Sequence, residues 1–214
     1  MPGKHSLARR RSYRQPLPRI LIVCEGTETE PSYFMALRHH EKSLIELEIE
    51  PGGVPKTLVE KAAALKRSAN KAAKRDPNLR YDHVWCVFDI DEHPNVAEAV
   101  QQARDNGIEL AISNPCFELW ILLHFEDQTA HIERRALHRA CVRHLPGYEK
   151  KVPFDSLRRY YPDAVRRALS LRNWQETRGG DEYTTNPWTA VQNLTELILS
   201  FRRLGEASGS FRTS

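Results

Sequence analysis

Long hydrophobic runs are absent from this sequence of 214 residues. The longest apolar stretch covers 119–125 and is interrupted by His124, whereas a membrane-spanning helix needs about 20 apolar residues. The basic N-terminus has no apolar segment behind it, so the pattern of a secretory signal is missing as well. We therefore predict no membrane span and a cytoplasmic location.

Cysteine is scarce and dispersed. The four cysteines are Cys24, Cys86, Cys116 and Cys141, and no two of them form a Cys-x-x-Cys pair. Cys24 and Cys86 stand within apolar runs, where a reduced thiol packs as a small hydrophobic group. This usage predicts neither a disulfide framework nor a zinc site.

The composition excludes disordered and fibrous chains. Hydrophobic residues make up 40% and charged residues 28% of the sequence, with 10 glycines and 13 prolines. Such a chain can bury a substantial core, and its length fits one domain with an appendage. The sequence has no internal repeat.

Positive charge is concentrated in three segments, although the net charge is only +4. Residues 1–19 carry six basic and no acidic side chains, residues 56–80 eight and two, and residues 131–172 eleven and four. A single charged run is ordinarily solvated surface. Three basic segments around an acidic remainder favour a polyanionic partner, namely nucleic acid.

Four stretches in the first half have the pattern of β-strands. Two of them, 20–24 and 84–88, are wholly apolar, as in strands covered on both faces. Within 45–49, hydrophobic residues alternate with glutamates, which indicates a half-exposed strand near an edge. Residues 108–112 are expected to form the fourth strand. Helical patterns over 31–40, from 55 onward and over 96–106 separate them. This alternation predicts an α/β fold with a mainly parallel central sheet and flanking helices.

The second half has a helical pattern. One helix is expected to open at Asn114-Pro115, with Asn114 as its cap and Pro115 in its first turn, and to be buried. The last helix is expected after Asn186-Pro187. We therefore expect a basic arm over 1–19, an α/β core over 20–126, a helical C-terminal extension packed on it over 127–204, and a tail over 205–214.

Carboxylates stand where two of the apolar strands end. Glu25 follows the first of them, and Asp89 and Asp91 end the third strand in the chain. Ligands of open α/β sheets bind at the carboxyl ends of the strands, and Asp89 and Asp91 point to one side because side chains alternate. Oxygen ligands favour Mg²⁺ or Mn²⁺ over zinc. We predict that the three acids hold one such cation; alternatively, they only cap helices or begin loops.

Three motifs of this chain resemble those of the RloB-like family. They are residues 25–31 (EGTETEP), 89–93 (DIDEH) and the most specific, 114–120 (NPCFELW). The resemblance runs from Ile20 to the C-terminal helix. It implies a variant of the Toprim fold and Mg²⁺-dependent phosphodiester hydrolysis in anti-phage defence of the abortive-infection kind. It also implies RNA, such as tRNA, as the substrate and an ABC-type ATPase as a partner.

The resemblance also assigns roles. Glu25 corresponds to the Toprim glutamate, and Asp89 and Asp91 to its metal-binding aspartates, which makes these three the expected catalytic and metal-binding residues. Many Toprim domains place a glutamate two positions after the second aspartate, whereas His93 stands there in this chain. The motif is therefore compatible with one bound metal ion or with two. Supporting roles are expected for Glu30, His93, Glu118 and Lys150.

Each supporting residue also has a plainer interpretation. Glu30 can simply favour the positive end of the following helix, and His93 can be a bystander in a loop. Glu118 can join the acidic cluster or pair with a base such as Lys150. Backbone phosphates are expected to contact basic residues on two helical segments, namely Arg67, Lys71, Lys74, Arg134, Arg135, Arg139 and Arg143.

Three functions are compatible with this sequence. The first is a metal-dependent endonuclease that acts on RNA in preference to DNA. The second is a non-catalytic subunit of a defence complex that binds nucleic acid or the ATPase. The third is primase-like nucleotidyl transfer, which would need a nucleotide pocket, and no Gly-rich phosphate loop is visible. A homo-oligomer is compatible with each of them.

Overall fold

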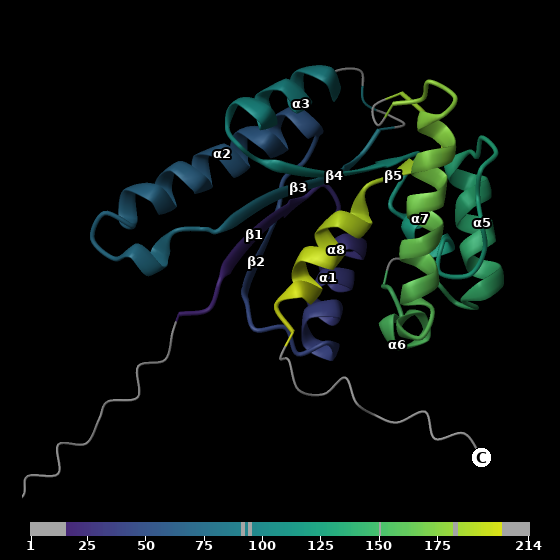
Figure 1. Ribbon diagram of the computed structural model, residues 1–214, viewed down its shortest axis with the longest axis horizontal. Helices are drawn as coiled ribbons and strands as arrows, with labels where there is room; N and C mark the ends of the chain where they lie inside the picture. The colour runs from purple at the N-terminus through teal and green to yellow at the C-terminus, as the bar shows by residue number, and fades with distance from the viewer. Residues whose placement is uncertain (1–15, 91–92, 94–95, 150, 182–183, 203–214) are drawn as a thin grey trace, which may run out of the picture.

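A five-stranded sheet forms the centre of the computed structural model, which describes residues 16–90, 93, 96–149, 151–181 and 184–202. The strand order is β2-β1-β3-β4-β5 (Figure 1). The first four strands are parallel and β5 is antiparallel to β4. Their bounds are β1 Arg19–Cys24, β2 Glu46–Pro51, β3 His83–Asp89, β4 Glu109–Asn114 and β5 Trp188–Thr189. The α/β prediction is confirmed.

Helices cover both faces of the sheet (Figure 1). On one face lie α2 (Pro55–Ala72) and α3 (Val96–Asp105), which pack on the side chains of Leu21 and Val23. On the other face the core is built around Ile20, Ile22 and Cys24. The helices that share this second core are α1 (Thr29–His40), α4 (Glu118–Leu122), α5 (Arg134–His144), α6 (Phe154–Arg158), α7 (Tyr161–Glu176) and α8 (Val191–Ser200). A 3₁₀ turn, η1 (Pro77–Leu79), precedes β3.

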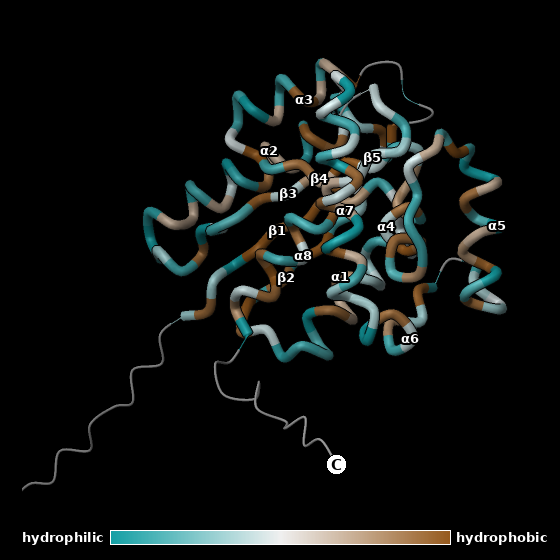
Figure 2. The backbone as a smooth tube through the Cα atoms, turned by 45° about the vertical axis from the view of Figure 1, so that its right-hand side comes forward, coloured by the Kyte–Doolittle hydropathy of each residue, from teal (hydrophilic) through white to brown (hydrophobic). Residues whose placement is uncertain are grey.

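The hydrophobic pattern explains this arrangement. Hydrophobic residues follow the central strands in Figure 2, and β1 and β3 are almost completely buried. The edge strand β2 is only half-buried, as its alternating glutamates predict. All four cysteines are buried free thiols. Among the described residues, no helix is both long and apolar enough to cross a membrane.

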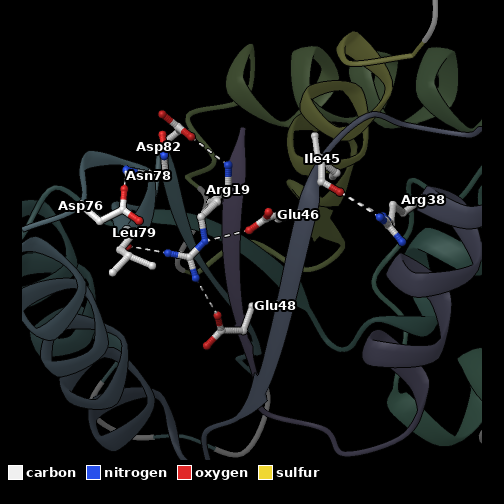
Figure 3. Close-up of polar contacts among 9 residues, drawn as sticks. All are labelled: Arg19, Arg38, Ile45, Glu46, Glu48, Asp76, Asn78, Leu79 and Asp82. Atoms are coloured by element: carbon white, nitrogen blue, oxygen red, sulfur yellow. Dashed lines mark hydrogen bonds and ion pairs between the residues drawn. The ribbon is translucent and has the colours of Figure 1, made fainter. Parts of the chain in front are cut away.

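Arg19 ties the edge of the sheet together (Figure 3). Its guanidinium contacts Glu46 at 3.1 Å and Glu48 at 3.4 Å on β2, and it also donates a hydrogen bond to the carbonyl of Leu79 in η1. Its backbone N–H donates to Asp82 at 2.8 Å. One residue therefore joins β1, β2 and the segment that leads into β3.

One expectation for the second half is wrong. Asn114 does not cap a helix: it is the last residue of β4 and pairs with Trp188 of β5. The helix begins only at Glu118, without a side-chain cap. The last helix does follow Asn186-Pro187, as expected, although the two-residue strand β5 comes first and α8 starts at Val191. At Asn114, strand pairing with a distant segment overrides the local helix-start signal, so the C-terminal extension contributes a strand to the sheet as well as helices.

Candidate functional site

Glu25 and Asp89 lie side by side at the carboxyl edge of the sheet. Glu25 directly follows β1, and Asp89 ends the neighbouring parallel strand β3. The backbone N–H of Asp89 donates to Oε2 of Glu25 at 3.1 Å, and the N–H of Glu25 donates to the carbonyl of Val87 at 2.9 Å. The strand register therefore brings together two acids that are 64 positions apart.

His93 contacts the same glutamate. Its Nε2 lies 2.9 Å from Oε1 of Glu25, and both side chains are largely buried. Because a carboxylate only accepts hydrogen bonds, Nε2 is the donor. Glu25 is thus held through both carboxylate oxygens, by the backbone of Asp89 and by His93. The expectation that His93 is near the site agrees with this placement.

Asp89 is a buried acid in an acidic environment. It is 8% exposed, and burial raises its pKa well above the ordinary value. The negative charges of Glu30, Glu25 and Glu118 raise that pKa further, while Arg134 opposes them. Nη2 of Arg134 donates to Oδ2 of Asp89 at 3.1 Å. The arginine is the first residue of α5 and therefore joins the C-terminal helices to the site.

Glu30 is also buried at this edge. It lies in the first turn of α1, is 5% exposed, and its carboxyl group packs directly against Gly26. Burial raises the pKa of Glu30, and the negative charges of Glu118 and Glu25 raise it further. Hydrogen bonds from the backbone N–H groups of Glu30 and Gly26 lower this pKa in part. An acid that only favoured a helix terminus would not need to be buried. The structure therefore places Glu30 in the acidic cluster.

Four carboxyl groups thus influence one another near the ends of β1 and β3. They belong to Glu25, Glu30, Asp89 and Glu118. The half-buried Glu118 is the first residue of α4, the helix that follows β4. The other three acids follow β1, lie in α1 and end β3, so each acid belongs to a different element or loop. Clustered carboxylates in a partly dry site repel one another, and bound cations relieve such repulsion.

Comparison with known proteins gave one result. The model of the family described as RloB-like protein matches residues 20–198, which is most of the chain. The chain belongs to the RloB-like family. Neither the curated proteins nor the solved structures gave a match.

The donor set of this RloB-like chain fits part of a site for a hard divalent cation. Glu25 and Asp89 offer only oxygen ligands, and the carboxylates of Glu30 and Glu118 add negative charge around them. Within the described ranges, no three His, Cys, Asp or Glu side chains are grouped so that they could hold a metal ion. The expected third ligand, Asp91, and the supporting Lys150 lie outside the described residues. Of the three predicted ligands, the structure therefore describes only Glu25 and Asp89.

The two predicted basic segments lie on different parts of the molecule. α2 covers one face of the sheet with α3, whereas α5 belongs to the helices of the other face (Figure 1). On or just after α2 lie Arg67, Lys71 and Lys74, and on α5 lie Arg135 and Arg139. These five side chains are exposed. The two segments therefore belong to helices on opposite faces of the sheet.

Sequence reasoning missed the contact between Arg134 and Asp89. Arg134 is predicted only as one of four phosphate contacts on this helix, with Arg135, Arg139 and Arg143, and nothing local distinguishes it from the others. The two partners are 45 positions apart and belong to different halves of the fold. Only the packing of α5 against α4 brings the two residues together, so this contact could not be predicted from the sequence.

Proposed function

We propose that this RloB-like protein is a divalent-metal-dependent nuclease that hydrolyses phosphodiester bonds in RNA. The observation that carries the proposal is the pairing of Glu25 and Asp89 at the carboxyl ends of two adjacent parallel strands. A protein that only supports an assembly gains nothing from buried acids that repel one another. The family resemblance supports RNA as substrate, a role in anti-phage defence and an ATPase partner.

The metal would be held by Glu25 and Asp89, with Asp91 as the third ligand implied by the resemblance. Bound Mg²⁺ supplies electrostatic stabilisation of the negative charge on the phosphate under attack. The residues of the chain supply the rest. Glu25, which is held by the backbone N–H of Asp89 and by His93, would either complete the metal site or instead accept the proton of the attacking water. Attack forms the new P–O bond and releases the proton of the water, the bond to the leaving oxygen breaks, and that oxygen takes up a proton from solvent water.

The test compares three charge-neutral variants with the wild-type chain. Labelled RNA and plasmid DNA are incubated with each protein in Mg²⁺, in Mn²⁺ and in chelator. Glu25→Gln and Asp89→Asn should each lower the cleavage rate by about a hundredfold or more, as expected when a catalytic proton acceptor or a metal ligand is removed. The matched control is Glu176→Gln, at an exposed position of α7. Cleavage that continues unchanged in Glu25→Gln and Asp89→Asn contradicts the proposal.

A second function is favoured by a different observation. Asp89 already pairs with Arg134, and Glu25 with His93, so both acids have partners without a metal. This arrangement supports a non-catalytic subunit that binds nucleic acid or an ATPase. In that case the wild type and both variants would be equally inert in every cation while still binding RNA.

A further inference from the structure

A basic cavity opens at the start of α5. It has a volume of about 420 Å³ and is lined by Glu118, Arg134, Arg135, His138 and Arg139. The lining thus combines three arginines and one histidine with a single acid. Arg135 and Arg139 are four positions apart and lie on one exposed face of the helix, and the half-buried Arg134 and His138 have the same spacing.

This cavity adjoins the acidic cluster through two of its own residues. Arg134 lines the cavity and also donates to Asp89 at 3.1 Å. Glu118 lines the cavity, and its charge acts on both Asp89 and Glu30. A ligand in the cavity is therefore next to residues that contact or act on Asp89, the acid that ends β3.

We propose that this cavity binds a backbone phosphate of the nucleic acid beside the Glu25–Asp89 pair, and that Arg67 and Lys71 in the second half of α2 take no part. The proposal rests on the proposed function for the identity of the ligand as a nucleic acid. Arginine suits the task because its planar fork meets two phosphate oxygens at once. The site binds phosphate rather than a base, so it gives position and affinity without sequence preference.

The direction of α2 places the basic residues of its second half, Arg67 and Lys71, away from this site. The helix follows β2 and returns antiparallel to the strands, so its second half lies toward their amino ends. Lys66 shows this directly, because its Nζ donates to the carbonyls of Asn106 and Gly107, just before β4 begins. Arg67 and Lys71 follow Lys66, whereas the acids lie at the opposite edge. The seven residues of β3 separate the two edges by about 20 Å at ~3.3 Å per residue.

The experiment compares two double substitutions that each remove two exposed positive charges. Arg135→Gln/Arg139→Gln changes the cavity, and Arg67→Gln/Lys71→Gln changes α2. Binding of a short fluorescent single-stranded RNA, and of its DNA equivalent, is measured by anisotropy at several salt concentrations. Chelator is present, so nothing is hydrolysed. Thermal unfolding of each variant verifies that the fold is intact.

The α5 pair should weaken binding by about tenfold or more, since hydrogen bonds between charged groups are the strong ones. Its salt dependence should also become shallower, by about 0.7 in the log–log slope for each phosphate that the variant no longer neutralises. The α2 pair should change affinity less than about twofold. Equal losses of affinity in both pairs, a greater loss in the α2 pair, or no measurable binding by the wild type at low salt overturns the proposal.

These outcomes are separate from those of the cleavage test. Binding in chelator does not depend on hydrolysis. A chain that binds RNA through α5 but cuts nothing would keep the phosphate site and overturn the nuclease. A chain that cuts RNA equally well and binds it equally tightly after the α5 substitutions would do the reverse.

Discussion

The carboxyl group of Glu30 occupies the space that a side chain on Gly26 would need. Gly26 follows Glu25 directly, and Glu30 is the second residue of α1. The absence of a side chain at Gly26 therefore lets a buried acid approach the turn that carries Glu25. This contact gives the glycine of the 25–31 motif a physical role, which is close approach rather than an unusual backbone conformation.

Gly26→Ala should accordingly lower the free energy of unfolding by about 1–3 kcal/mol, the usual cost of overpacking a tight site. In a Glu30→Ala background the same change should cost less than about 0.5 kcal/mol, because the clashing group is gone. Urea unfolding of the four proteins of this cycle measures the coupling. Equal costs in both backgrounds would show that Glu30 does not limit the space at Gly26.

Asp89→Asn should stabilise the protein in the absence of divalent cations. The raised pKa of Asp89 means that its ionised form is disfavoured in the folded state, so an amide of the same shape relieves repulsion at neutral pH. We expect the unfolding midpoint to rise by about 3 °C for each kcal/mol of added stability. Mn²⁺ should then raise the midpoint of the wild type but not that of Asp89→Asn. A variant that is less stable than the wild type and still responds to Mn²⁺ contradicts this account.

Arg134 should compete with a cation for Asp89. Arg134→Gln removes the guanidinium from Oδ2 of Asp89, so Mn²⁺ should bind more tightly, by up to about tenfold for ~1.4 kcal/mol of competition. Calorimetric titration measures the affinity directly. The matched control is Arg135→Gln, which removes the adjacent charge of α5 and should change Mn²⁺ affinity much less. Weaker Mn²⁺ binding by Arg134→Gln would mean that the arginine supports the site instead of competing for it.

Local patterns predict the elements that position the acids. The apolar runs that form β1 and β3 are identified correctly because they have only one way to be buried, at the centre of a sheet. The ends of these strands place Glu25 and Asp89 at one edge without further information. The same reasoning could also have predicted that Arg67 lies away from the carboxyl ends of the strands, because a helix between parallel strands runs back along the sheet.

The remaining features depend on contacts between distant segments. Asn114 and Pro115 have a strong helix-start pattern, yet Asn114 pairs with Trp188 as part of the sheet. The burial of Glu30 depends on how α1 packs over the turn at Gly26. Neither effect leaves a periodic signal in the sequence, because each is fixed by the packing of the folded chain rather than by a repeating pattern.

His124 should make the protein sensitive to acid. It is 1% exposed, its Nδ1 donates to the carbonyl of Trp120 at 2.9 Å, and burial lowers its pKa from 6.5 to about 4. The folded state therefore resists protonation that the unfolded chain accepts. The stability that neutral His124 contributes is complete above pH 6.5 and is lost as the pH falls toward 4, by up to about 3 kcal/mol. In His124→Gln the free energy of unfolding should depend less on pH across this interval, whereas His131→Gln, at an exposed position, should retain the wild-type slope. Identical pH profiles for His124→Gln and the wild type would show that the imidazole titrates alike in the folded and unfolded states.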